Sequence, residues 1–313
     1  MKVINDLRQM HRMEKPCVIA LGTFDGLHLG HQDVIKAAQR AAAAQDALLA
    51  VFTFSNHPMQ LIRPEKLPAA LLTKEQKYKL LEQLGVELLV DLPFNWELAN
   101  LSPLSFIDKL EQLGVCGVVV GENFTFGCKG AGNCELLAAE AAKRGFKLDI
   151  RPLITNGTTQ ELICSTAIRR MILNGQVEAA AGFLGRCYVL SGTVAHGNER
   201  GRLLGFPTAN IELAHTKIAV PPVGVYAVRA ILSNGAVYNA MANIGNNPTF
   251  GDVLLPRLEV HIFDFAGDIY GEQLTIEFIA RLRDQVKFVG IDALKAQLAA
   301  DKAACKAILD KSK

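Results

Sequence analysis

Residues 17–44, CVIALGTFDGLHLGHQDVIKAAQRAAAA, decide the fold of the first half of the chain. The segment opens with five consecutive apolar residues, and such an unalternated run is typical of a strand buried on both faces. A turn containing three glycines follows, and apolar residues then recur at helical spacing over residues 32–44. This order predicts a strand, a turn and a helix, which together form the first unit of an α/β domain.

The same alternation continues along the chain as far as residue 183. Short apolar runs, partly β-branched, predict buried parallel strands, and the segments between them carry apolar residues at helical spacing. Successive strand-helix-strand units predict a doubly wound α/β domain over residues 1–183. The further strands are expected at residues 47–54, 87–92 and 117–120, and the further helices at residues 74–84, 104–113, 135–144 and 176–184.

After Gly185 the apolar period changes from helical to alternating. Alternating segments separated by turns such as Ser233-Asn234-Gly235 predict a small antiparallel β-barrel over residues 184–313. The Ala-rich amphipathic stretch at residues 291–309 predicts a C-terminal helix packed on this barrel. The barrel strands are expected at residues 188–195, 223–232, 236–243, 257–265 and 273–282.

Composition narrows the class of partner. The 313 residues are 50% hydrophobic and 20% charged, as in globular proteins. Residues 1–183 carry 19 Lys+Arg and 19 Asp+Glu, and the remainder carries 14 and 12, so neither half has a basic excess. Because nucleic-acid binders normally carry a cationic surface, we expect no nucleic-acid partner and a small phosphate-bearing substrate instead.

Cysteine usage and hydropathy indicate the compartment. The seven cysteines are scattered and never spaced as CxxC, which argues against a disulfide framework and against a zinc site. The first residues lack the apolar core of a signal peptide, and no apolar run reaches 18 residues. We therefore expect a cytoplasmic protein with no membrane partner; self-association is left open.

The turn after the first strand is a candidate phosphate site. It contains Gly22, Phe24, Asp25 and Gly30 and two histidines, His28 and His31, three residues apart. A glycine-rich turn that opens a helix exposes backbone N–H groups, which favour phosphate. The two imidazoles can point at one ligand, whereas the alternative for a bare HxGH is simple capping or packing.

A second helix start carries similar chemistry. Ser165, Thr166 and Arg169 lie in the segment ICSTAIR at residues 163–169, where hydroxyls, free N–H groups and a guanidinium could bind an anion. The alternative is an ordinary capping sequence with a solvated arginine. Asn123, in the segment GENFTFG after the fourth expected strand, is a further candidate, although the neighbouring aromatic residues could equally belong to the core.

The run HGNERGRLLGFPTAN at residues 196–210 is the most specific stretch in the chain. Its glycines allow the backbone to approach phosphates, and the oxygen atoms of Thr208 and Asn210 are of the type that Mg²⁺ prefers. An isolated Pro-Thr turn capped by Asn210 is the alternative. The candidate residues here are Gly197, Gly201, Arg202, Gly205, Thr208 and Asn210, joined by Asn246 in the later segment NIGNNPTF.

Glu259 is the candidate general base. It lies with His261 in an expected strand where the two side chains share one face. We expect this carboxylate to point into the barrel, where burial is costly unless the group has a partner or a role. The alternative is a strand glutamate on the solvent face, which is the commoner position for this residue type.

In this order the motifs resemble those of bacterial bifunctional riboflavin kinases and FMN adenylyltransferases, also called FAD synthetases. The resemblance implies a Rossmann-like nucleotidyltransferase domain, then a riboflavin kinase-like barrel. It also implies that riboflavin and ATP give FMN and ADP at the C-terminal site, and that FMN and ATP give FAD and pyrophosphate at the N-terminal site, both with Mg²⁺. It assigns ATP to His28 and His31, Mg²⁺ to Thr208 and Asn210, and the role of base to Glu259. Asn123 would contact the nucleotide near the flavin, and Ser165, Thr166 and Arg169 would bind pyrophosphate.

Four positions depart from the family pattern. Ser55 and Asn56 replace Asp-Pro, Cys164 replaces a serine, and Val260 replaces a common threonine. Three of the four lie in the adenylylation half, so one alternative is a competent kinase with a weakened synthetase. A non-catalytic flavin sensor is a second alternative, which the joint presence of both histidines, the metal pair and the base argues against.

Overall fold

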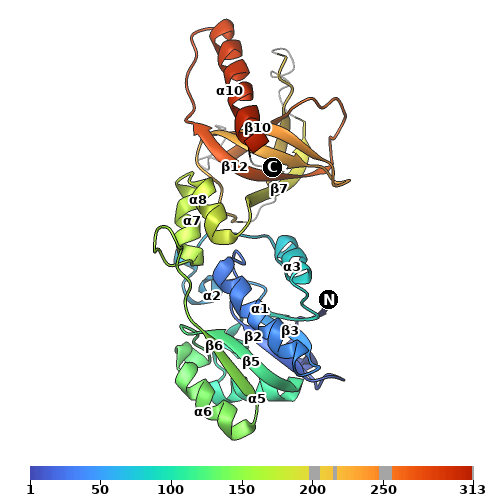
Figure 1. Ribbon diagram of the computed structural model, residues 1–313, viewed down its shortest axis with the longest axis vertical. Coiled ribbons are helices and arrows are strands. Elements are labelled where there is room, and N and C mark those ends of the chain that lie inside the picture. The colour runs from blue at the N-terminus through green and yellow to red at the C-terminus, as the bar shows by residue number, and fades with distance from the viewer. Residues whose placement is uncertain (197–204, 214–216, 247–255, 312–313) are drawn as a thin grey trace. The chain divides into compact units, whose positions relative to one another are not determined.

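The computed structural model describes residues 1–196, 205–213, 217–246 and 256–311 (Figure 1). The chain divides into two compact units, Met1–Ser165 and Thr166–Lys313. The helices α7, Ser165–Leu173, and α8, Val177–Leu184, therefore fall almost entirely in the second unit, whereas the sequence groups them with the first half. The expected domain boundary after residue 183 stays a prediction.

The first unit is built on a six-stranded sheet in the order β1-β4-β3-β2-β5-β6, and every neighbouring pair is parallel. This confirms the doubly wound α/β fold. Two strands were not expected, because β1 is only three residues long and β6 alternates charged with apolar residues at the sheet edge. The strands are β1 Lys2–Ile4, β2 Cys17–Leu21, β3 Leu48–Phe54, β4 Leu88–Leu92, β5 Val115–Gly121 and β6 Lys147–Arg151.

Helices cover both faces of this sheet. Apolar residues of α1 and α3, such as Ile35 and Leu81, belong to one core cluster, and those of α5 and α6, such as Ile107 and Leu137, belong to the other. Their N-termini are capped by side chains, as at Thr73, which forms a capping box with Gln76. The helices are α1 Leu29–Ala43, α2 Met59–Ile62, α3 Lys74–Gln83, α4 Trp96–Ala99, α5 Pro103–Leu113 and α6 Cys134–Arg144.

The sheet order fixes where a ligand would bind. From β2 the chain passes to β3 and β4 on one side and then to β5 on the other, so the order reverses beside β2. Ligands of open α/β sheets bind at the carboxyl ends of the strands next to such a reversal. The turn after β2 and the loop after β5 lie at this edge.

The second unit is a closed barrel in the order β10-β11-β8-β7-β12-β9, and all its pairs are antiparallel, which confirms the expected architecture. Only β8 was not expected, because this short strand begins directly after the Pro207-Thr208 pair that indicates a turn. The strands are β7 Tyr188–Ala195, β8 Ala209–Leu213, β9 Gly224–Ile231, β10 Val237–Asn246, β11 Pro256–Ile262 and β12 Gln273–Arg283.

The C-terminal helix α10, Ile291–Lys311, packs on the outside of the barrel, as expected (Figure 1). Its Cys305 and Leu309 are fully buried and share a core cluster with Met241 and Phe263. None of the described helices is both long and apolar enough to cross a membrane.

Candidate active sites

In the first unit, the turn after β2 brings the two histidines together. His28 is the N-cap of α1, and its Nδ1 accepts a hydrogen bond from the backbone N–H of His31 at 3.3 Å. The two imidazole rings stack with their centroids 3.6 Å apart and their planes at 19°. His28 therefore caps the helix and also forms a pair with His31, so the capping interpretation and the ligand interpretation are compatible.

The turn is wound tightly around these rings. Phe24 and Leu27 have φ angles of 50° and 43°, a region that costs energy for residues other than glycine. Phe24 is buried and meets the His31 ring edge-on at 5.2 Å. A Cβ atom on Gly22 would lie 3.1 Å from the Phe24 ring, and one on Gly30 would lie 3.2 Å from the His28 ring. A side chain at either glycine would therefore crowd the rings of Phe24 and His28.

Burial keeps His31 neutral in the free protein. Its Nδ1 is buried and has no hydrogen-bond partner among the described residues. Burial, and then the charges of His28 and Lys77, hold the pKa of His31 well below its usual value. Since this Nδ1 has no hydrogen-bond partner in the described part of the chain, it could bond to an incoming ligand.

Lys77 of α3 is a residue of this site that the sequence analysis missed. Its ammonium donates to Thr53 Oγ1 at 2.9 Å and to the carbonyl of Phe54 at 3.0 Å. Thr53 in turn donates to the carbonyl of Thr23, within the turn after β2, at 2.9 Å. Burial lowers the pKa of Lys77. The available signal was its position four residues before the buried Leu81, which places a lysine on the inner face of the helix.

The structure connects one other candidate, Ser165, to the same turn. The Ser165 hydroxyl donates to the Asp25 carbonyl at 2.8 Å, although the two residues are 140 positions apart. The Asp25 carboxylate accepts the backbone N–H of Leu71 at 3.0 Å, so it has a structural partner. Thr166 and Arg169 belong to the second unit, and their place at the pyrophosphate stays a prediction.

Asn123 follows β5, the neighbour of β2, and is exposed. Its amide oxygen lies 3.3 Å from the position that a Cβ atom added to Gly121 would occupy. Phe124 stacks on Phe126 and packs against the core, which favours a packing role for this aromatic residue.

Asn56, one of the departures from the family pattern, has a definite role. Its amide donates to the Phe94 carbonyl at 3.2 Å and accepts the Phe94 backbone N–H at 2.7 Å. These two bonds join the loop after β3 to the loop after β4. The departure therefore supports the frame of the site, and nothing in the structure indicates that it disables the site.

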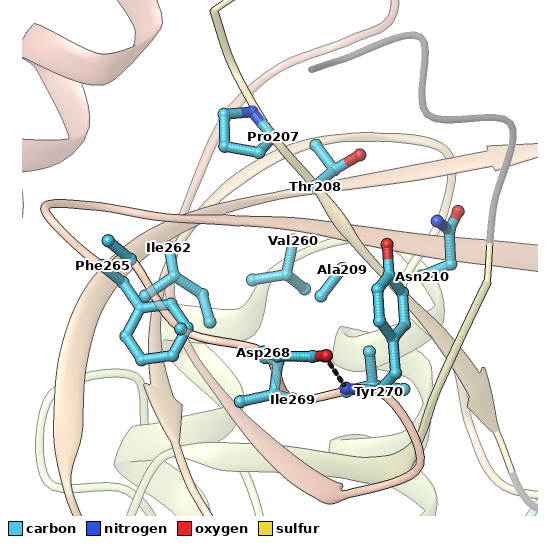
Figure 2. Close-up of a pocket in the computed structure, with 13 residues that line it drawn as sticks. Pro207, Thr208, Ala209, Asn210, Val260, Ile262, Phe265, Asp268, Ile269 and Tyr270 are labelled. Atoms are coloured by element: carbon cyan, nitrogen blue, oxygen red, sulfur yellow. Dashed lines mark hydrogen bonds between the residues drawn. The ribbon is translucent and has the colours of Figure 1, made fainter.

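In the second unit, Thr208 and Asn210 lie on the border of two cavities of about 620 and 480 Å³. The first cavity opens at an end of the barrel interior. Figure 2 shows Ala209, Val260 and Ile262 lining it from two strands, with Phe265, Asp268 and Tyr270 along the loop that closes it. Mostly apolar walls with a few polar groups are typical of a small-molecule site.

The second cavity lies between the outer face of the barrel and α10. Glu259 and His261 line it from β11, and Leu298 lines it from α10. The two β11 side chains share a face, as expected, but Glu259 does not point into the barrel. Strand alternation places Leu258 and Val260 inside instead, where both are 0% exposed.

His261 braces the wall between the two cavities. Its Nδ1 lies 2.8 Å from the carbonyl oxygen of Pro207, directly before Thr208. Its Nε2 is buried and has no partner in the part of the chain that the structure describes. Burial lowers the pKa of His261, so the ring is neutral near pH 7.

Some kinase candidates lie outside the described residues, namely Gly197, Gly201 and Arg202. Asn246 ends β10, but its side chain is not described. Gly205 has a φ of 82°, which favours glycine directly before the Phe206-Pro207 pair.

Comparisons with known proteins cover both units of the chain. Models of two families, FAD synthetase and riboflavin kinase, match residues 10–167 and 184–309. A bifunctional riboflavin kinase/FMN adenylyltransferase of Bacillus subtilis is 42% identical over 289 residues, which is 91% of this chain and 90% of the relative. The chain belongs to the bifunctional riboflavin kinase/FMN adenylyltransferase family.

Other members and a solved structure extend the match over the full length. The bifunctional riboflavin kinase/FMN adenylyltransferase of Haemophilus influenzae is 35% identical and covers 99% of this chain and 100% of its own. A crystal structure from Streptococcus pneumoniae, named as a macrolide-efflux protein, is 34% identical with a TM-score of 0.87 over 97% of this chain and 98% of its own. Both units of this chain therefore share their folds with that crystal structure.

The kinase unit of this family member offers oxygen ligands to a cation. Thr208 and Asn210 are two residues apart at the start of β8 and therefore share one side of the strand. The Asn210 amide oxygen already accepts hydrogen bonds from a cation, the guanidinium of Arg257. Hydroxyl and amide oxygens are of the kind that Mg²⁺ accepts, so this donor set fits the metal that the resemblance implies.

Proposed function

We propose that this member of the riboflavin kinase/FMN adenylyltransferase family makes FMN from riboflavin in its second unit and FAD from FMN in its first, with ATP consumed at both sites. One observation carries the proposal. Each compact unit holds its own candidate site, and a separate family model spans each of them. A single-activity enzyme would not need both.

The two cavities of the second unit suggest how phosphoryl transfer is arranged. Glu259 lines only the cavity under α10, so the substrate whose hydroxyl loses a proton, riboflavin, belongs there. ATP then occupies the cavity at the barrel end, with its γ-phosphate at Thr208 and Asn210, which border both. Glu259 accepts the proton of the ribityl 5'-hydroxyl while the 5'-oxygen bonds to the γ-phosphorus of ATP. The bond from the γ-phosphorus to ADP breaks, and ADP leaves.

Mg²⁺ belongs to this proposal through Thr208 and Asn210. When bound, Mg²⁺ neutralises charge on the β- and γ-phosphates. The chain's own part is to orient the nucleotide in one cavity and the acceptor in the other, which converts the reaction into an intramolecular step.

In the first unit, the FMN phosphate attacks the α-phosphorus of ATP and pyrophosphate leaves. His28, His31 and the N–H groups at the start of α1 donate hydrogen bonds to the phosphate under attack, where negative charge develops. Ser165 bonds to the Asp25 carbonyl of this turn. The resemblance assigns the departing pyrophosphate to Ser165, Thr166 and Arg169, and the nucleotide to Asn123. The cytoplasmic location, the lack of a nucleic-acid partner and self-association stay predictions.

The test measures ADP release with riboflavin and pyrophosphate release with FMN, in the wild type and in two variants. His28→Ala/His31→Ala should lose about 10²- to 10³-fold in FAD formation and keep FMN formation. Glu259→Gln should lose about 10²- to 10⁴-fold in FMN formation and keep FAD formation from supplied FMN. Glu212→Gln, an exposed glutamate on β8, is the matched control.

The alternatives give different results in the same assay. A wild type that releases ADP but little pyrophosphate is a kinase with a weakened synthetase. A wild type that binds flavin and releases neither product is a sensor. Equal loss of both activities in either folded variant would contradict the assignment of one site to each unit.

A further inference from the structure

Arg257 connects the two kinase residues with the most distinct proposed roles. Its Nε donates to Asn210 Oδ1 at 2.9 Å and forms an ion pair with Glu259 Oε1 at 3.0 Å, and its Nη2 donates to the same Asn210 oxygen. Strand pairing explains the contact, because Asn210 and Glu259 are direct partners across β8 and β11, and Arg257 precedes Glu259 by two residues on the same face. The side chain is 26% exposed and lines the cavity under α10.

These bonds use the full acceptor capacity of one atom. An amide oxygen has two lone pairs, and in Asn210 two N–H groups of one guanidinium occupy both. A divalent cation therefore cannot take this oxygen while Arg257 keeps both bonds. The guanidinium and the metal ion are two cations that compete for the same amide oxygen.

We propose that Arg257 is a positioning residue of the kinase site that gives up Asn210 to the incoming divalent cation and keeps Glu259. Before the metal arrives, Arg257 holds the amide oxygen and the carboxylate together. After it arrives, Arg257 bonds to Glu259 alone and fixes the direction of the carboxylate toward the substrate hydroxyl. The inference rests on the proposed roles of Asn210 and Glu259.

The proposal predicts two effects of opposite sign when the guanidinium is removed. Cation binding should become tighter, because a competing donor to the metal's ligand is gone. Turnover should fall, because Glu259 loses its remaining partner. A residue that only stabilises the fold would not improve any binding step, so the tighter metal binding separates the two roles.

The experiment uses the full chain with Mn²⁺ as the probe of the metal site. Direct titration of Mn²⁺ is followed by electron paramagnetic resonance in the wild type, Arg257→Met, Arg257→Lys and Asn210→Ala, and the Mn²⁺ site lost in Asn210→Ala defines the kinase site. Lys295→Met, which removes an exposed positive charge from α10 of the same unit, controls for net charge.

Arg257→Met should bind Mn²⁺ roughly fivefold more tightly at the site lost in Asn210→Ala, since one net hydrogen bond is about 1 kcal/mol. The kcat for riboflavin phosphorylation should fall about tenfold with little change in the KM for riboflavin. Arg257→Lys should recover part of the turnover, because its ammonium can still reach one acceptor. Lys295→Met should match the wild type in both measurements.

Unchanged or weaker Mn²⁺ binding by a folded Arg257→Met protein would overturn the exchange between the guanidinium and the cation. If no Mn²⁺ site depends on Asn210 in the wild type or in Arg257→Met, the metal role of Asn210 fails and the inference fails with it. The two failures are distinguishable, because the first leaves an Asn210-dependent site in place.

Discussion

At the scale of single residues, the burial of His31 makes the stability of the first unit depend on pH. The ring is neutral in the folded protein because burial lowers its pKa well below 6.5. In the unfolded chain the same ring titrates near its ordinary value. A depressed histidine pKa means that the unfolded state binds more protons as the pH falls, so stability present above about pH 6.5 is lost below it.

We therefore expect the wild type to lose about 1.4 kcal/mol more stability than His31→Gln between pH 7.5 and 5.5, since one pH unit below the unfolded pKa is worth that amount. Urea unfolding can be followed by the fluorescence of Trp96, the single tryptophan, which lies in the first unit. If the free energy of unfolding changed equally with pH in the two proteins, His31 would take up its proton in the folded state as readily as in the unfolded state.

Candidate site residues were predictable from the sequence only where they belong to a motif. His28, His31, Thr208 and Asn210 stand in recognisable local patterns, and the structure places each pair together. Lys77 and Arg257 stand in no motif, since what singles them out is their contacts to other strands. The direction of Glu259 was wrongly expected, because strand alternation fixes which residues share a face but does not say which face lies inside.

At the scale of elements, α10 makes one wall of the cavity assigned to riboflavin, and ion pairs help to hold it on the barrel. Arg283 of β12 donates to both carboxylate oxygens of Asp301 on α10, at 2.9 and 2.6 Å. The Asp301 side chain is 4% exposed and the Arg283 side chain is 22% exposed. A second pair, between Lys306 of α10 and Asp264, lies at the surface with Asp264 72% exposed.

Asp301→Asn should destabilise the second unit by about 2 kcal/mol, less than the loss of a fully buried pair because water reaches Arg283. It should also raise the KM for riboflavin, as α10 loosens over the cavity. Asp264→Asn is the matched control, since it breaks an ion pair to the same helix at the surface. The measurements are urea unfolding and riboflavin kinetics. Equal effects of the two variants would mean that apolar contacts alone hold α10.

Helices and strands were predicted correctly where the apolar pattern extends over a long segment. They were missed where the segment is short or lies at the edge of the sheet. The helices and the central strands follow from apolar periodicity, and β2, for example, spans the expected residues. The edge strand β6 resembles a solvated loop in sequence, because only its pairing with β5 makes it a strand. Similarly, β8 is defined by its pairing with β7 and β11 on either side of it in the barrel, and β11 lies far from it along the chain.

At the scale of the whole molecule, the division into two units followed from the change of apolar period. The compact units divide after Ser165, and the expected boundary after residue 183 stays a prediction. The apolar residues of α8 recur at helical spacing, as they do in the α/β half that precedes it, so the sequence groups α8 with that half. In the structure it packs against β12 and β7 of the barrel. The Glu178 carboxylate accepts the backbone N–H of Arg281 at 3.1 Å, and Val177 and Phe183 are almost completely buried.

The contacts of α8 make the boundary testable with two fragments. Residues 166–313 should fold and phosphorylate riboflavin, since this fragment keeps α8 on the barrel. Residues 184–313, cut at the boundary expected from the sequence, should be several kcal/mol less stable, because burial of a Val or Phe side chain is worth about 1.5–3 kcal/mol. Urea unfolding and the rate of ADP release measure both properties. Neither fragment should make FAD, since His28 and His31 are absent from both. If residues 184–313 are as stable and as active as residues 166–313, α8 adds nothing to the barrel, and the boundary after residue 183 is the physical one.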